Sequence, residues 1–274
     1  MSSTKQSATE EKPKFETNSK FQYTTPPSPN WVPGTGATSD DWKHHKKISL
    51  DPYANSRTPV SNYKLLTSAI TPRPIGFVST VSVDGTSRNL APFSYFNLAN
   101  HDPPLFTLGL SGGPGRLKDT CRNILETKEC TISIISEWFI EAANYTCTDA
   151  PSDVDEWELA GLTPLPSMKV KPEHVAESAF SVECKLVTHH KWFSKLEPER
   201  QTGTLLILEG VNFHVREDMV VDPEGFTGLD PEKLKPVARM GGVLYTRSRE
   251  GFELGRPDYK TDVQPVVDSA ENTD

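Results

Sequence analysis

A glycine-rich loop that runs into a predicted helix carries the clearest binding chemistry in this sequence. Residues 111–118 read SGGPGRLK, and the ten residues that follow have the apolar spacing of a helix. Glycine lets a backbone approach a ligand closely, and the first turn of a helix offers free N–H groups. Arg116, Lys118 and Arg122 add positive charge, and Thr120 adds a hydroxyl. This combination predicts a phosphate site, with a solvated surface turn as the competing interpretation.

Polar and aromatic side chains gather around a predicted hairpin that precedes this loop. The segment PIGFVSTVSVDG at 74–85 alternates apolar and polar residues, as a strand does, and ends in an Asp-Gly turn signal. The return strand runs through RNLAPFSYFN at 88–97, where we expect Pro92 to break the ladder because proline has no N–H to donate. A flat heteroaromatic ligand needs an aromatic wall and a few polar groups at its rim. The candidates for these groups are Arg73, Ser79, Thr80, Asn89, Ser94, Tyr95 and Asn97. Core packing and an ordinary solvent face would account for the same residues.

The length, charge and composition of the sequence are those of an ordinary globular protein, and they argue against several classes of function. The 274 residues carry 29 Lys and Arg against 37 Asp and Glu, and the net charge of −8 argues against a nucleic-acid or anionic-membrane surface. The sequence contains neither an apolar run as long as a membrane span nor the apolar core of a signal peptide, so we expect a cytoplasmic protein. The four cysteines lack CxxC spacing. No cluster of His, Cys, Asp and Glu suits a metal, and neither a nucleophile elbow nor a Walker motif is present.

We expect three parts along the chain. Residues 1–48 are rich in Ser, Thr, Pro, Lys and Glu and are predicted to form an extended or disordered arm. Because Trp31 and Trp42 lie in this arm, docking on its own domain or on a partner subunit competes with a free tail. Residues 49–256 form the compact domain, and residues 257–274 form a polar, acidic tail.

The domain is predicted to be mostly β with inserted helices. The alternating patterns give six strands, at about 74–85, 88–97, 105–110, 130–135, 180–193 and 203–215. Helices are expected at 61–68, 119–128 and 136–145, the last with Ser136 as its N-cap, and a long loop is expected at 148–175. Since the strands do not alternate regularly with helices, a closed, mainly antiparallel barrel is the natural architecture.

Five blocks of the sequence, taken together, resemble the flavin reductase-like family of FMN-binding split barrels, in its flavoredoxin-type branch. They are PRPIGFVSTVS at 72–82, NLAPFSYFN at 89–97, DPP at 102–104, KDTCRNI at 118–124 and RMGGVLY at 239–245. The blocks have the order and spacing of the family over residues 60–256, and the long N-terminal arm looks most like the fungal members. The resemblance implies a six-stranded antiparallel Greek-key split barrel, and a homodimer with FMN near the subunit interface.

The resemblance also implies roles for individual residues. The family's phosphate block matches Lys118, Asp119 and Thr120, which agrees with the independent interpretation of the loop. The other implied FMN contacts are Arg73, Ser79, Thr80, Asn89, Pro92, Phe93, Ser94, Tyr95, Phe96, Asn97 and Arg122. A structural or interface role is implied for Arg239, Gly242 and Tyr245. No catalytic side chain is assigned, although His189 is a candidate for lining the side where a nicotinamide would bind.

The leading hypothesis for function is hydride transfer from NAD(P)H to FMN, and from there to free flavin, oxygen or a partner protein. Because the cofactor carries such chemistry, the lack of a triad or of paired carboxylates is expected. One alternative is a flavoredoxin-like electron carrier or an FMN-dependent oxygenase. Another is a non-enzymatic dimeric barrel that binds a ligand or partner. Split-barrel proteins that oxidise pyridoxamine phosphate fit the five blocks less well.

Overall fold

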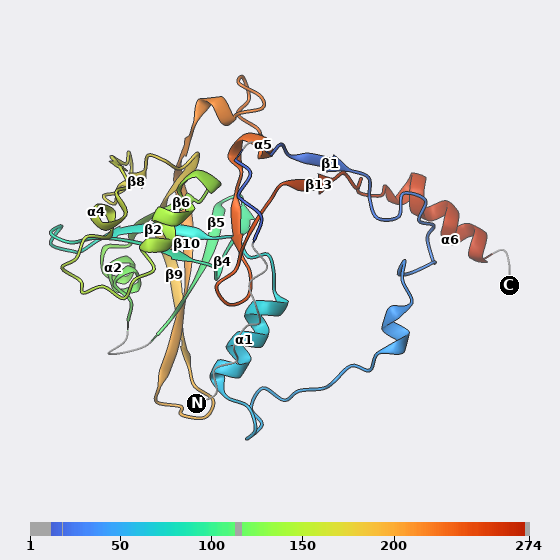
Figure 1. The fold of residues 1–274 in the computed structure, drawn as a ribbon, viewed down its shortest axis with the longest axis horizontal. Coiled ribbons are helices and arrows are strands. Elements are labelled where there is room, and N and C mark those ends of the chain that lie inside the picture. Colours follow the sequence, from blue (N-terminus) through green and yellow to red (C-terminus); the bar gives the residue numbers. More distant parts are fainter. Residues whose placement is uncertain (1–11, 18, 113–116, 272–274) are drawn as a thin grey trace.

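One seven-stranded antiparallel sheet forms the body of the protein, in the order β3-β2-β6-β9-β10-β5-β4 (Figure 1). The computed structural model describes residues 12–17, 19–112 and 117–271. The strands of the sheet are β2 (Gly76–Val81), β3 (Arg88–Phe93), β4 (Phe96–His101), β5 (Pro104–Ser111), β6 (Glu129–Ile134), β9 (Phe180–Phe193) and β10 (Gln201–Val215). The expected mostly β, antiparallel architecture with inserted helices is confirmed.

The segment 88–97 supplies two strands at opposite edges of this sheet. β3 pairs with β2 and β4 pairs with β5, so the chain crosses from one edge to the other at Ser94 and Tyr95. Tyr95 holds this corner on β5, because its carbonyl accepts a hydrogen bond of 2.7 Å from the Gly109 N–H. Pro92 lies inside β3 opposite Phe77, so the expectation that it breaks the ladder is wrong. β3 is an edge strand, the position in a sheet where proline is tolerated.

Two apolar clusters make the core, and β2 contributes to both. The first lies among the sheet strands and α2 (Asp119–Thr127), and it contains Val78, Leu108, Ile124 and Leu206. The second lies where β2 and β3 meet α3 (Ile140–Tyr145) and α4 (Glu156–Ala160), and it contains Phe77, Leu90, Phe139 and Trp157. Neighbouring residues of β2 thus point into different clusters, as the period of two in a strand requires.

The helix expected at 136–145 is divided, and its expected cap is wrong. Glu137–Phe139 forms a 3-10 turn, η2, and α3 follows it. The Ser136 hydroxyl makes no capping bond and is buried without a hydrogen-bond partner among the described residues. The backbone of Ser136 instead forms a β-bridge with Pro236. The long loop expected at 148–175 contains α4 and two short paired strands, β7 (Pro164–Leu165) and β8 (His174–Val175).

An N-terminal and a C-terminal segment of the chain pair beside the sheet. β1 (Gln22–Thr24) pairs in parallel with β13 (Glu250–Phe252), and the Phe15 ring lies against the Arg247 and Arg249 guanidinium groups. Beyond β1 the chain leaves the sheet, passes through η1 (Asp41–His44) and returns at α1 (Pro59–Ala69) (Figure 1). The tail forms a π-helical turn, Tyr259–Val263, that continues into α6 (Gln264–Glu271). The remaining elements are η3 (Glu217–Met219), α5 (Pro231–Leu234), β11 (Val237–Arg239) and β12 (Tyr245–Arg247).

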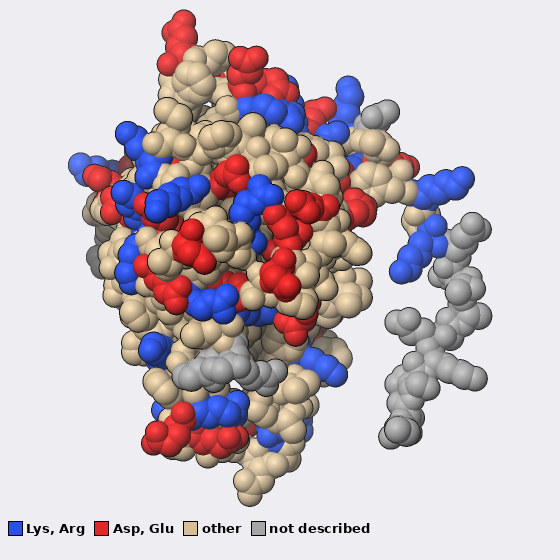
Figure 2. Space-filling view, turned by 90° about the vertical axis from the view of Figure 1, so that its left-hand side faces the viewer, with Lys and Arg blue, Asp and Glu red and all other residues tan. Residues whose placement is uncertain are grey.

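The surface carries charges of both signs. On the face drawn in Figure 2, Lys and Arg side chains are interspersed with Asp and Glu rather than collected into one basic field. Within the described residues, each helix is too short or too polar to cross a bilayer.

Candidate functional site

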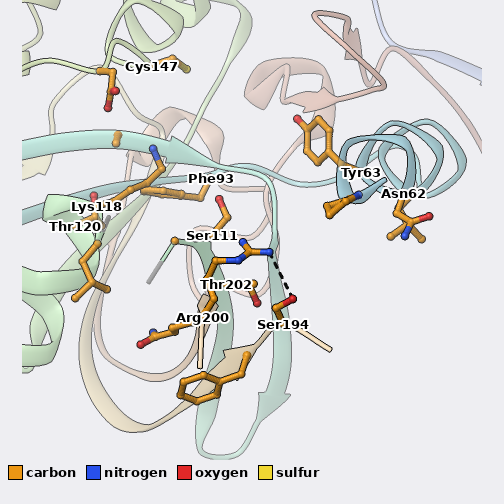
Figure 3. Close-up of a pocket in the computed structure, with 18 of the residues that line it drawn as sticks. Asn62, Tyr63, Phe93, Ser111, Lys118, Thr120, Cys147, Ser194, Arg200 and Thr202 are labelled. Carbon is orange, nitrogen blue, oxygen red and sulfur yellow. Dashed lines mark hydrogen bonds between the residues drawn. The ribbon is translucent and has the colours of Figure 1, made fainter. Parts of the chain in front are cut away.

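An open cleft of about 1540 Å³ lies where four parts of the chain meet (Figure 3). Its walls come from α1 and the residues before it, from β3, from the start of α2, and from the hairpin that joins β9 to β10. Of the residues that the sequence nominated, Asn89, Pro92, Phe93, Lys118, Asp119 and Thr120 line it. Segments far apart in the sequence thus bring the predicted phosphate loop and part of the predicted aromatic wall into one space.

One end of the cleft is suited to an anion. Lys118 is the N-cap of α2, and no side chain caps this helix. The N–H groups of Asp119, Thr120 and Cys121 therefore have no partner within the helix, and the Lys118 ammonium group is exposed beside them. Arg122 pairs with the Asp119 carboxylate, which leaves Lys118 as the described cation closest in sequence to the free N–H groups. Arg116 lies outside the described residues.

A layer of buried polar contacts supports this end of the cleft from below. The Asn89 amide donates a hydrogen bond of 2.8 Å to the Thr120 hydroxyl, which ties β3 to the first turn of α2. The Asn123 amide donates to the Thr80 hydroxyl at 3.1 Å and ties β2 to the same helix. Ser79 and Thr80 are both buried and are not among the residues that line the cleft. Thr80 therefore supports α2 rather than the ligand space, and Ser79, the preceding residue of β2, points to the opposite face of the strand.

The residues from Phe93 to Asn97 lie in three different environments. Phe93 lines the cleft, and together with Ser94 and Tyr95 it also lines an adjoining cavity of about 260 Å³. Tyr63 of α1 and Tyr245 of β12 complete the aromatic lining of that cavity. Phe96 is buried in the first apolar cluster, and Asn97 is exposed on β4. The cleft and the cavity together provide an aromatic wall next to the anion end.

Arg73 and His189 lie apart from this space. The buried Arg73 guanidinium donates to the carbonyl oxygens of Thr67 and Ile70, each at 2.6 Å, and to that of Met240 at 2.9 Å. These bonds fasten the end of α1 and the 239–245 block to the corner at Ser94, where a longer contact of 3.5 Å reaches the hydroxyl. His189 is exposed on β9 opposite Leu206, outside the lining of both cavities.

Glu156 is a cleft residue that sequence reasoning missed. It opens α4, is buried, and its carboxylate accepts a hydrogen bond of 3.2 Å from the Leu90 N–H. Burial raises the pKa of this carboxyl, and the nearby Asp119 and Asp155 carboxylates act in the same direction. Asp155 itself is held by Arg88, which also pairs with Glu173 at 3.3 Å. Glu156 lies in the stretch predicted as a loop, where no periodic pattern marks a buried acid.

The hairpin at the far side of the cleft and Cys147 were also missed. Arg200 and Ser194 lie on this hairpin and are joined by a contact of 3.5 Å between Nη2 and Oγ (Figure 3). The Arg200 Nε also donates to Glu197 at 2.9 Å. Cys147 borders both the cleft and the smaller cavity; the residue is exposed, and partial desolvation of its thiol raises the pKa. Neither place carries a motif in the sequence, because the fold alone brings the hairpin and Cys147 to the cleft.

Comparison with known proteins gives the family. The model of the flavin reductase like domain matches residues 68–230, and the chain belongs to this family. An uncharacterised protein of Aquifex aeolicus is 37% identical over 187 residues, which are 68% of this chain and 89% of that protein. Component B of nitrilotriacetate monooxygenase from Bacillus cereus has a similar structure, with a TM-score of 0.70 and 35% identity over 77% of this chain and all of that one.

Two further solved structures support the same fold. The 2-nitrobenzoate 2-nitroreductase NbaA of Pseudomonas fluorescens has a TM-score of 0.66 and 26% identity, over 78% of this chain and 98% of that one. A split-barrel protein of Shewanella frigidimarina has a TM-score of 0.60 and 24% identity, over 75% and 95% of the two chains. The sheet described above is therefore the split barrel of the flavin reductase-like proteins, as the resemblance implied.

Proposed function

We propose that this protein binds FMN in the cleft and accepts a hydride on it from NAD(P)H, with free flavin, oxygen or a partner protein as the final acceptor. The observation that supports this proposal is the joining of an anion end and an aromatic wall in one open space. The uncapped start of α2 and the Lys118 ammonium group suit a phosphate, and Phe93 with Pro92 suits the face of a flat ring.

The residues of the chain would bind and orient the cofactor, which itself supplies the redox chemistry when bound. Lys118 and the first-turn N–H groups of α2 would hold the phosphate, and Asn89 would keep Thr120 in place beneath it. Main-chain groups at Ser94 and Tyr95 would meet the rim of the ring system. The cleft of about 1540 Å³ exceeds the roughly 300–1,000 Å³ of a usual small-molecule site, which leaves room for a second ligand such as NAD(P)H.

A second candidate function is supply of electrons to a separate protein. The Bacillus cereus neighbour is named as a component of a monooxygenase, which favours a reductase or electron-carrier role for this chain as part of a larger system. We also propose that the working form is a homodimer, as the family resemblance implies.

The test is a visible spectrum of the protein loaded with FMN, followed by anaerobic titration with NADH and with NADPH. We expect the flavin absorbance to bleach with at least one nucleotide. Slow bleaching with both nucleotides, but fast bleaching with a partner reductase, would favour the second candidate, an electron carrier. Protein that cannot be loaded with FMN would exclude both candidates and favour the non-enzymatic barrel.

The phosphate assignment predicts a large effect of Lys118→Ala on flavin affinity. A charge-assisted hydrogen bond contributes about 1–3 kcal/mol, so the FMN dissociation constant should rise about 5- to 150-fold. Lys185→Ala is the matched control, because Lys185 is exposed on β9 outside the lining of the cleft. Equal flavin affinity of the two variants in a fluorescence titration would remove Lys118 from the site.

A further inference from the structure

The floor of the cleft contains the buried carboxyl of Glu156. The residue is 7% exposed and lines the cleft, and its Oε2 accepts the 3.2 Å hydrogen bond from the Leu90 N–H. Within the described residues this is the one hydrogen bond that the carboxyl receives from another residue, and it takes part in no ion pair. Burial of a carboxylate with neither a cation nor a full set of donors is unfavourable, so such a group prefers the neutral, protonated form.

The other carboxyls close to Glu156 are held by guanidinium groups. Asp155, the residue before it, pairs with Arg88, and Asp119 at the start of α2 pairs with Arg122. The ionisable residues on α3, which packs against α4, and directly after it are exposed: Glu141, Tyr145 and Cys147. Both guanidinium groups are thus engaged by neighbouring acids, and the exposed groups are screened by water and salt.

The Glu156 carboxyl lies one residue away from the contact that fixes the start of α2. The N–H that it accepts belongs to Leu90, the residue after Asn89, and the Asn89 amide donates to the Thr120 hydroxyl at 2.8 Å. Glu156, Asn89, Thr120 and Lys118 all line the same cleft. An anion held by Lys118 and the first-turn N–H groups of α2 would therefore share its space with this carboxyl.

A bound anion and an ionised Glu156 would repel each other. When two like charges share a partly desolvated site, the group that can take up a proton does so. In the free protein burial already raises the pKa of Glu156, and the Asp119 and Asp155 carboxylates add to this effect. The charge of a bound phosphate acts in the same direction and would raise the pKa of Glu156 again.

We propose that Glu156 takes part in ligand binding as a neutral carboxylic acid, so that binding of an anion at the start of α2 brings one proton from solvent onto this carboxyl. The protonated group can donate its O–H to an oxygen of the ligand, whereas the ionised group can only accept. A phosphate oxygen is a strong acceptor for such a donor. The inference rests on the anion end of the cleft given under the proposed function, and it adds that affinity at this end depends on a proton.

The direction of the pH dependence follows from the two protonation states. At low pH Glu156 is neutral in the free protein and in the complex, so its proton does not affect affinity. As pH rises through the pKa of the free protein, the free carboxyl loses the proton that the complex retains, and affinity falls by up to about tenfold per pH unit. Glu156→Gln keeps a neutral donor of the same shape, so its affinity lacks this dependence.

The experiment is a fluorescence titration of the full chain with FMN, at one-unit steps of pH above the ordinary glutamate value of 4.5. The quantity of interest is the dissociation constant of the wild type divided by that of Glu156→Gln, because ionisation of the ligand itself cancels in this ratio. We expect the ratio to rise about tenfold or more with pH. Glu158→Gln is the matched control, since Glu158 is exposed on the same helix outside the cleft lining, and it should follow the wild type.

A ratio that stays constant with pH would overturn the inference, and so would a Glu158→Gln control that behaves like Glu156→Gln. Circular dichroism checks that each variant retains its fold. Calorimetry of FMN binding in two buffers of different ionisation enthalpy tests the wild type alone. Uptake of a proton is expected there, and uptake at no pH would contradict the role of Glu156.

Inorganic phosphate separates this inference from the proposed function. Its binding is followed by the backbone amide signals of Thr120 and Cys121 in NMR spectra of the same three proteins. Phosphate binding with a rising ratio, but no binding of FMN, would refute the proposed function and leave the role of Glu156 standing. Binding of FMN with a constant ratio would do the reverse, and binding of neither ligand would refute both.

Discussion

The carboxylate of Glu183 allows a stability prediction whose size follows from the structure. Glu183 lies on β9, is fully buried, and accepts hydrogen bonds from the N–H groups of Met168, Lys169 and Val170. The Asn212 amide donates to it at 3.0 Å, and its distance to the His214 ring nitrogen is 2.6 Å. One carboxylate therefore fastens the loop before β8 to β9 and β10.

These hydrogen bonds lower the pKa of the Glu183 carboxyl, whereas burial raises it. Burial alone would raise the pKa, but the hydrogen bonds from Met168, Lys169, His214 and Asn212 outweigh it and lower the pKa from 4.5 to about 2. A pKa that is lower in the folded state contributes stability that is present above the unfolded value and is lost as pH falls toward the folded value. The difference of about 2.5 units corresponds to roughly 3 kcal/mol of unfolding free energy.

We expect Glu183→Gln to lose about 3 kcal/mol of unfolding free energy at pH 7, and the difference from the wild type to shrink between pH 4.5 and pH 2. The measurement is urea unfolding of both proteins across this pH range. Glu199→Gln is the control, because Glu199 is exposed on the β9–β10 hairpin. A destabilisation of Glu183→Gln that stays constant with pH would refute the reasoning, since it would reflect lost packing rather than the ionised carboxylate.

Two further predictions concern the floor of the cleft. Asn89→Ala removes the bond that fixes Thr120, so flavin affinity should fall about fivefold, for roughly 1 kcal/mol, in a fluorescence titration, and unchanged affinity would contradict the role given to this pair. Burial raises the pKa of Glu156, so the stability that this group contributes is present below its ordinary pKa and is lost as pH rises through the folded pKa. Glu156→Gln should therefore gain unfolding free energy relative to the wild type as pH rises above the ordinary glutamate value of 4.5, and a difference that does not change with pH would count against a buried, ionising carboxyl.

The local sequence pattern alone predicted some of the strands and helices. The alternation in 74–85 predicted β2, and the acidic first turn and apolar spacing after residue 118 predicted α2. The position of Lys118 directly before that helix followed as well, because the predicted helix began at Asp119. The two parts of segment 88–97 could not be separated, since a strand that changes partners at Ser94 has the same alternation as one that does not.

The role of each polar residue depended on what the fold placed next to it. Arg73 resembles a phosphate ligand in the sequence, yet its guanidinium group is bound by two backbone carbonyls from the nearby end of α1 and by one from the distant residue Met240. Thr80 and Asn89 are both polar residues on neighbouring strands, but Asn89 borders the cleft whereas Thr80 lies beneath α2. The alternation of apolar and polar residues predicts which face of a strand a residue occupies, but it does not predict which part of the chain packs on that face.

By itself the sequence determined most strands of the sheet, the helix α2 that follows the glycine-rich loop and, through five spaced blocks, the family. These are properties of short segments and of their order along the chain. The tertiary structure alone decided that the chain corner at Ser94 joins two edges of one sheet, that Glu156 is buried in the cleft floor, and that α1 and the arm keep their apolar faces uncovered. Burial and contact arise between residues tens or hundreds of positions apart, and local spacing does not record them.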